Sequence, residues 1–323
     1  MRRSTRRRFL SQAAGTAVGA LLWTGAKNAL VSAAIGAAQD NGPNLRFPPQ
    51  ARERIAVSSY PFRDFIAGLD DPASASRHKM ELKDFAAHVL AKFNINKIEP
   101  WSRHFRSLEP AYLEELRAAV KKSGAAIVNV AVDGEHSPYA AEREERERAI
   151  EFSKKWIDVA VAVGSPSVRT NLPRAKDAEP DVERAAETLR RVTEYGSAKK
   201  VVVNLENDNP VSEDPFFLTQ LIDKVSSPWL HALPDFANTL ATGNEQHAYA
   251  GIDAMFGRAY NICHVKAMEA NDSGQVFHVD LARTFGILKS HGYKGYCSME
   301  FDSPGDPYLG TKELIADTVQ YLA

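Results

Sequence analysis

Cysteine is scarce in this sequence of 323 residues, with two copies at positions 263 and 297. That scarcity excludes a cysteine-rich zinc site. Long apolar runs are scarce near the N-terminus as well, since the apolar stretch of residues 13–23 is short and contains glycine. A transmembrane helix needs about 20 apolar residues in a row. We therefore expect no stable membrane span.

Acidic residues are missing from the first 38 positions, which carry six basic residues and no other charge. Residues 5–10 read TRRRFL, a twin-arginine pattern, and small residues surround positions 33–38. This arrangement predicts a cleaved signal peptide over residues 1–38, recognised by the twin-arginine export machinery, and a periplasmic or secreted protein. The alternative is a chance basic N-terminus before an anchor helix. Residues 39–52 follow no pattern and predict a linker.

Without that signal the chain is acidic. It keeps 34 basic residues (40 less the six of the signal) against 41 acidic ones, a net charge of −7 by count. An acidic surface disfavours a nucleic-acid backbone or an anionic lipid surface as the main partner. We expect no nucleic-acid partner, and a homo-oligomer is possible.

From residue 53 to residue 323 apolar segments alternate with amphipathic ones. The expected strands are residues 55–60, 97–101, 126–132, 167–171, 201–207, 229–235, 261–266 and 296–300. The expected helices are residues 82–93, 111–122, 140–163, 182–195, 216–225, 246–256, 281–290 and 312–322. Strands that are apolar on both faces are typical of a parallel sheet covered by helices. Eight such pairs predict a single α/β domain, a (β/α)₈ TIM barrel.

Four polar residues stand where strands five to eight end. They are Glu206, Asp235, His264 and Glu300, separated by 29, 29 and 36 residues, about one βα unit each. The carboxyl ends of the strands in such a barrel share one mouth, where chemistry is found. We therefore expect the four side chains to meet. The alternative is that each is a helix cap or a salt-bridge partner in a loop.

Three carboxylates and one imidazole are mostly hard oxygen donors. This set favours one divalent metal, Mn²⁺ before Mg²⁺, Co²⁺ or Zn²⁺. A metal polarises a carbonyl and its neighbouring hydroxyl, which lowers the barrier to removing the proton between them. Glu206 and Glu300 are then the candidate catalytic pair for moving that proton.

The two cysteines lie close to this set, one and three residues before His264 and Glu300. Strand alternation predicts that both thiols face away from the lumen, into the helix layer. Their unequal distance from the strand ends predicts an offset that works against a disulfide. We expect two buried free thiols.

The residues around the four strand ends resemble a known family. Leu205-Glu206-Asn207, Pro234-Asp235, His264-Val265-Lys266 and the last two units, residues 274–300, are similar to the xylose isomerase-like TIM-barrel superfamily of sugar phosphate isomerases and epimerases. The resemblance implies a metal held by Glu206, Asp235, His264 and Glu300, with Glu206 and Glu300 as the paired acid and base.

Two positions depart from the ketose 3-epimerases of that superfamily. Those relatives place a histidine where this chain has Asn238 and an arginine where it has Ala270. Both contact substrate in the relatives, so ketose 3-epimerisation in particular is in question. The endonuclease branch with three metals fits less well, although His104 and His136 could mimic its additional ligands.

Further residues at the mouth are candidates for binding substrate: Glu99, Trp101, Arg169, Lys266 and Asn238. Glu99 and Trp101 could hydrogen-bond and stack a sugar, Lys266 could stabilise an enolate oxygen, and ordinary ion pairs and packing are equally plausible. Asn204, two residues before Glu206, is expected to orient it.

These features predict an exported, metal-dependent isomerase or epimerase that acts on an unphosphorylated sugar or keto-sugar. One alternative uses the same centre as a 3-keto-glycoside lyase or hydrolase, which expels an aglycone by β-elimination. Another, from a different class, is a periplasmic sugar-binding module without catalysis.

Overall fold

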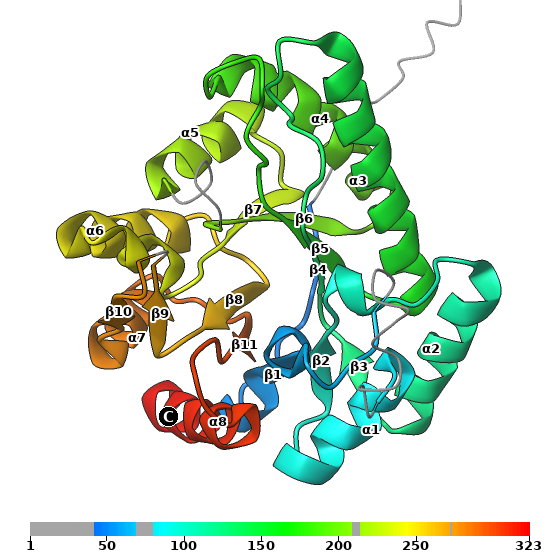
Figure 1. Cartoon of the computed structure of the whole chain (residues 1–323), viewed down its shortest axis with the longest axis vertical. Helices are drawn as coiled ribbons and strands as arrows, with labels where there is room; N and C mark the ends of the chain where they lie inside the picture. The colour runs from blue at the N-terminus through cyan, green and yellow to red at the C-terminus, as the bar shows by residue number, and fades with distance from the viewer. Residues whose placement is uncertain (1–41, 69–79, 209–213, 272) are drawn as a thin grey trace, which may run out of the picture. The chain divides into compact units, whose positions relative to one another are not determined.

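A closed ring of parallel strands inside a ring of helices makes up the fold (Figure 1). The computed structural model describes residues 42–68, 80–208, 214–271 and 273–323. The predicted signal peptide, residues 1–38, lies outside the described residues. The fold is the predicted α/β barrel.

The strands form two parallel sheets that meet edge to edge. The barrel strands are β1 (Ile55–Ser58), β2 (Lys97–Glu99), β3 (Ala126–Ile127), β4 (Val130–Val132), β5 (Ser167–Thr170), β6 (Val202–Glu206), β7 (Leu230–Leu233), β8 (Ile262–Val265) and β11 (Tyr296–Met299). One sheet has the order β3-β2-β1-β11-β8 and the other β4-β5-β6-β7. Single bridges from Trp101 to Ala131 and from Asp235 to His264 join the sheets. The third predicted strand is thus split into β3 and β4, one in each sheet.

In the part of the chain that the structure describes, eight α-helices cover the outside of the strands (Figure 1). They are α1 (Leu82–Phe93), α2 (Pro110–Lys122), α3 (Arg143–Val163), α4 (Val182–Lys199), α5 (Pro215–Val225), α6 (Glu245–Phe256), α7 (Leu281–Ser290) and α8 (Pro307–Leu322). Their apolar faces pack against the strands, and all five residues of β6 are buried. Burial on both faces explains why the strands read as uninterrupted apolar runs.

Helix ends differ most from the prediction. Helix α8 begins five residues earlier than predicted, because the Asp306 side chain accepts a hydrogen bond from the Tyr308 amide and Pro307 occupies the first turn. Helix α4 continues to Lys199 and ends at Lys200, which takes the left-handed conformation with φ of 61°. A short antiparallel hairpin, β9 (Met268–Ala270) with β10 (Val276–His278), was not predicted.

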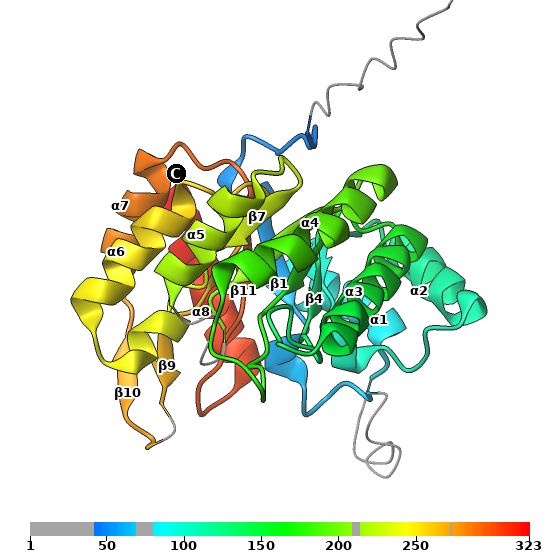
Figure 2. The same ribbon diagram turned by 90° about the horizontal axis from the view of Figure 1, so that it is seen from above.

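Residues 42–50, most of the predicted linker, pack against the end of the barrel where the strands begin. Phe47 makes edge-to-face contacts with Tyr260 and Tyr296, both with ring centroids 5.6 Å apart. The Leu45 amide donates to the Tyr260 hydroxyl, and that hydroxyl donates to the carbonyl of Pro43. A 3₁₀ turn, η1 (Ala51–Arg54), then leads into β1. Figure 2 shows this segment and the β9–β10 hairpin at opposite ends of the barrel.

The two cysteines are buried free thiols, as predicted, but the predicted offset is wrong. Cys263 and Cys297 are directly paired in the register of β8 and β11, and their sulfurs are 3.7 Å apart. Both side chains face the helix layer, and burial raises the pKa of Cys263 well above its usual value. Counting residues to the metal ligands was misleading because Glu300 follows the end of β11, whereas His264 lies within β8.

In the described part of the chain, no helix is both long enough and apolar enough to traverse a bilayer.

Candidate metal centre

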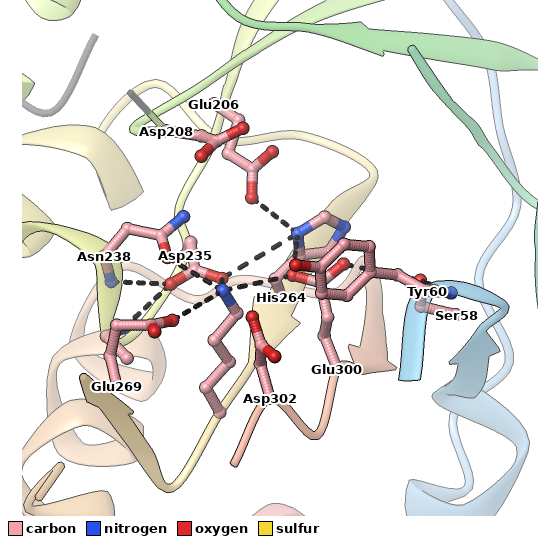
Figure 3. A network of polar contacts seen from close by, with 12 residues as sticks. Ser58, Tyr60, Glu206, Asp208, Asp235, Asn238, His264, Glu269, Glu300 and Asp302 are labelled. Carbon is pink, nitrogen blue, oxygen red and sulfur yellow. Dashed lines mark hydrogen bonds and ion pairs between the residues drawn. The ribbon is translucent and has the colours of Figure 1, made fainter. Parts of the chain in front are cut away.

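Four buried side chains converge where strands β6, β7, β8 and β11 end (Figure 3). They are the four residues predicted from the sequence: Glu206, Asp235, His264 and Glu300. One potential ligand atom from each lies within 4.8 Å of all the others. Segments up to 94 residues apart in the chain are brought together because parallel strands place all their carboxyl ends at one mouth.

The imidazole of His264 stands at the centre of the cluster. Its Nδ1 is 2.6 Å from Glu206 Oε1, 3.3 Å from Glu300 Oε2 and 3.8 Å from Asp235 Oδ2. The three carboxylates therefore surround one ring nitrogen, and that nitrogen is the one placed to bind a cation.

The backbone around Asp235 determines which of its oxygens faces the cluster. Oδ1 accepts hydrogen bonds of 2.8 Å from the amides of Ala237 and Asn238. The Asn207 side chain holds the residue in place by accepting from the Asp235 amide at 2.7 Å and donating to its carbonyl at 3.0 Å. Oδ2 is buried and has no hydrogen bond within the described part of the chain. A buried acceptor in that position fits a bound cation.

Glu99 lies beneath His264, where the sequence had suggested a contact with sugar. The carboxylate is fully buried, and both of its oxygens are 3.0 Å from His264 Nε2. Asn129 donates a 2.6 Å hydrogen bond to it. Glu99 therefore orients the imidazole instead of lining the cavity, the arrangement common for histidines that bind metals.

Arg169, also predicted to bind substrate, is buried beside Glu206. Its Nε is 2.6 Å from Glu206 Oε2, and its Nη1 is 3.0 Å from Asp133 Oδ1. The first ion pair holds Oε2 of Glu206, the oxygen that does not contact His264, and the second holds Arg169 in place. Asn204, in contrast, does not orient Glu206, because both polar atoms of its side chain are buried without a hydrogen bond among the described residues.

Lys266 lies on the opposite side of the cluster. Its Nζ donates to Asn238 Oδ1 at 2.8 Å and to Glu269 at 3.0 Å, and it is 3.4 Å from Glu300 Oε2. Burial alone would lower the pKa of this amine, but the surrounding carboxylates hold its pKa well above the usual value. Lys266 is therefore a cation that touches one member of the candidate catalytic pair.

The two glutamates differ in proton affinity. Burial raises the pKa of Glu206, although Arg169 and His264 oppose the shift. Burial acts in the same direction on Glu300, but His264 and Lys266 outweigh it and hold the pKa of Glu300 below its usual range. Two carboxyl groups with separated pKa values suit an acid and base pair.

The sequence model of one family, described as the xylose isomerase-like TIM barrel, matches residues 87–323. This chain belongs to the xylose isomerase-like TIM-barrel family. No curated protein sequence matches the chain significantly.

Solved structures share the fold of the family at low sequence identity. An L-ribulose 3-epimerase is 17% identical with a TM-score of 0.64, over 83% of this chain and 94% of that one. A xylose isomerase-like protein from Mycobacterium smegmatis, in complex with magnesium, is 16% identical with a TM-score of 0.62, over 85% and 99%. A 3-keto-D-glucoside 4-epimerase from E. coli is 14% identical with a TM-score of 0.60, over 81% and 97%. At these identities the likeness establishes the fold.

A cavity of about 630 Å³ opens beside the candidate metal centre of this xylose isomerase-like barrel, and Glu206 and Glu300 line it. Four of the five predicted substrate residues line it: Trp101, Arg169, Lys266 and Asn238. Ala270 also lines it, where the ketose 3-epimerases were expected to have arginine. Tyr60 and Asp133 contribute to the wall as well, although no motif in the sequence had marked them.

The extra histidines do not join the metal centre. His104 Nδ1 is 2.8 Å from Ser59 Oγ, and His136 Nδ1 is 3.1 Å from Glu145. Among the residues that the structure describes, the four-ligand cluster is the one group of potential metal ligands so close together.

Proposed function

We propose that this protein is a divalent-metal-dependent sugar isomerase or epimerase, working by proton abstraction next to a carbonyl. The observation that carries the proposal is the convergence of four buried ligand atoms within 4.8 Å at the floor of a cavity large enough for a sugar. Membership of a family with this fold supports it.

The donor set fits a divalent cation, Mn²⁺ before Mg²⁺, Co²⁺ or Zn²⁺. Glu206, Asp235, Glu300 and Nδ1 of His264 would hold it, and the buried Oδ2 of Asp235 has no other hydrogen-bond partner among the described residues. When bound, the cation would polarise the substrate carbonyl and the adjacent hydroxyl.

Glu206 and Glu300 are the residues proposed to move the proton. Glu206 is the last residue of β6 and Glu300 follows β11, with β7 and β8 between these strands, so the two approach the cluster from different sides (Figure 3). Glu206 takes the proton from the carbon next to the carbonyl, and Glu300, having taken up a proton from water, returns it from its own side. Lys266, 3.4 Å from Glu300, stabilises the negative oxygen that forms between the two steps.

The charges of the cavity favour an uncharged substrate. Each cation in its wall is already close to a carboxylate: the pairs are Arg63 with Asp302 at 2.8 Å, Arg103 with Asp133 at 3.4 Å, Arg169 with Glu206 at 2.6 Å and Lys266 with Glu269 at 3.0 Å. A phosphate group needs cations that are free to pair with it. This is the reason to propose an unphosphorylated sugar or keto-sugar.

Hydrogen exchange with solvent tests the proposal. The chain would be stripped with EDTA, reloaded with Mn²⁺, and incubated in deuterated water with a panel of ketoses and keto-sugars. We expect deuterium at the carbon next to the carbonyl only with metal present, and Glu206→Gln should abolish it. The absence of deuterium in every recovered sugar, with every metal, would refute proton abstraction.

A second candidate reaction is β-elimination from a 3-keto-glycoside. It begins with the same proton abstraction but then expels the aglycone. It is favoured by the departures at Asn238 and Ala270 from the ketose 3-epimerase pattern. Release of a free aglycone from a 3-keto-glucoside would distinguish elimination from epimerisation.

Export through the twin-arginine machinery is part of the proposed function and rests on residues 1–38. Fusing residues 1–45 to a reporter tests it. Changing Arg6 and Arg7 to Lys should retain the reporter inside the cell, and unchanged export would contradict the proposal.

A further inference from the structure

We propose that Tyr60 and Trp101 form an outer subsite, which binds the second ring of a glycoside or disaccharide while the first ring lies over the metal centre. This inference rests on the proposed function and specifies its substrate class. Three features carry it: the size of the cavity, the position of the two aromatic rings, and the contacts that connect them to Glu206.

The cavity is larger than one sugar ring needs. A hexose occupies roughly 200 Å³ at the packing density of organic crystals, whereas the cavity measures about 630 Å³. A single ring over the metal would leave most of that volume to water. Two linked rings would fill the greater part of it, as small-molecule sites generally enclose most of their ligand.

Tyr60 lies next to the metal-ligand cluster, and Trp101 lies one strand further from it. The ligands lie at the ends of four strands, β6, β7, β8 and β11, whereas Tyr60 and Trp101 follow β1 and β2. Both aromatic side chains line the same cavity. Adjacent strands lie about 4.8 Å apart, so the ends of β2 and β11 are about 10 Å apart, and a substrate that contacts both Trp101 and Glu300 is better matched by two rings than by one.

Contacts hold the Trp101 indole in a fixed orientation. Its Nε1 donates a 3.0 Å hydrogen bond to Asp133, and its ring meets the Tyr60 ring edge to face, with centroids 5.0 Å apart. His104 contacts it in the same way at 5.1 Å. Arg103 lies over the Trp101 ring, 5.7 Å from its centroid, so an ordered aromatic ring and a guanidinium donor would meet the sugar together, at little cost in conformational entropy.

A chain of polar contacts connects Trp101 to Glu206, one of the two candidate catalytic residues. Asp133 accepts from Trp101 through Oδ2 and from Arg169 through Oδ1, and Arg169 pairs with Glu206 at 2.6 Å. A buried ion pair thus sets the position of the aromatic ring relative to the candidate base. A ring bound against Trp101 would have its neighbour placed beside Glu206.

Sugar binding to the full chain loaded with Mn²⁺ tests the subsite. The probes are the disaccharides cellobiose, maltose and sucrose and their components glucose and fructose, with dissociation constants measured by titration calorimetry. We expect at least one disaccharide to bind about tenfold more tightly than either of its components. Trp101→Leu should abolish that preference, and Trp101→Phe, which keeps an aromatic face but loses the Nε1 donor, should restore most of it.

Tyr195→Leu, which removes an aromatic ring on α4, is the matched control and should keep the wild-type preference. Circular dichroism and Mn²⁺ affinity verify that each variant is folded with an intact metal centre. Equal binding of mono- and disaccharides by the wild-type chain, or a preference that survives Trp101→Leu, overturns the outer subsite and leaves the proposed function standing. Failure of every probe to bind overturns the outer subsite, whereas the deuterium-exchange experiment decides the proposed function separately.

Discussion

At the scale of single residues, the most informative contact joins Glu99 to His264. Glu99 accepts from Nε2 of the imidazole, so Nδ1 is left to face Glu206, Asp235 and Glu300. One buried carboxylate therefore decides which nitrogen can bind metal and keeps the ring from rotating.

Replacing Glu99 with Gln should weaken metal binding about 10- to 100-fold, since outer partners of metal ligands typically have effects of this size. Gln has nearly the shape of Glu but lacks the charge that holds the Nε2 proton. The measurement is Mn²⁺ affinity by titration calorimetry. Glu187→Gln, an exposed position on α4, is the control and should leave the affinity unchanged. Equal affinity in the wild type and in Glu99→Gln would rule out the positioning role.

Metal affinity should depend on pH through Asp235. Burial, together with the neighbouring Glu206 and Glu300, raises the pKa of this carboxyl from 3.8 to about 7 in the metal-free protein. The folded chain therefore holds a proton there that the unfolded chain would release near pH 4, and this contribution to stability is lost as pH rises from about 4 to 7. A cation must displace the same proton, so affinity should fall as pH drops below 7.

Calorimetric titration with Mn²⁺ in two buffers of different ionisation enthalpy measures the number of protons released. More protons should be released at pH 6 than at pH 8. The pKa of His264 is also raised, because Glu300, Glu99 and Glu206 outweigh the effect of burial, and its proton adds to the release. Affinity that is constant between pH 5.5 and pH 8 would contradict this account.

At the scale of secondary-structure elements, helix α8 supports the metal centre through a glycine. Gly310 lies against the ring of Phe301, the residue after Glu300, and a β-carbon at position 310 would overlap that ring. A close approach between this helix and the end of β11 is possible because position 310 has no side chain. The identity of one helical residue thereby affects where Glu300 is held.

Gly310→Ala should displace Phe301, lower the free energy of unfolding by roughly 1–3 kcal/mol and weaken Mn²⁺ binding. Denaturant unfolding and calorimetry measure the two effects. Gly286→Ala, in the middle of α7, is the matched control because a β-carbon there meets no atom within 4 Å. That control should be neutral or stabilising by up to about 1 kcal/mol. If both variants behave alike, the contact with Phe301 does not matter.

At the scale of the whole barrel, one end of the strands carries the candidate metal centre and the other end is covered by aromatic packing. The candidate metal ligands lie at the carboxyl ends, whereas Phe47 packs on Tyr260 and Tyr296 at the other end. This separation is typical of TIM barrels, in which one face carries chemistry and the other stability. Residues 42–54 thus belong to the barrel rather than to a free linker.

Phe47→Ala should lower the free energy of unfolding by about 1–2 kcal/mol, since it removes two aromatic contacts and part of the apolar cover. It should leave Mn²⁺ affinity unchanged, because the metal centre lies at the other end of the strands. Thermal or denaturant unfolding tests the first expectation and calorimetry the second. A large loss of metal affinity with unchanged stability would contradict this division between the two ends.

The amino-acid sequence alone was enough to predict the barrel and the convergence of the four candidate ligands. Apolar runs and helical periodicity are local properties, so helices such as Leu82–Phe93 could be predicted to the residue. The four candidate ligands could be found because each lies at or next to the carboxyl end of a strand. In a parallel barrel all the carboxyl ends lie at the same mouth. Boundaries such as the start of α8 were missed where a capping contact extended the helix beyond its apolar pattern.

Only the tertiary structure decided what surrounds the ligands. Glu99, Asn129 and His264 come from three separate strand regions, and no spacing in the chain shows that they touch. The pairing of Cys263 with Cys297 depends on the register of two strands, which hydrogen bonds set and residue counts do not. Periodicity reports which face of an element is buried, whereas contacts between side chains far apart in the chain depend on how the elements pack.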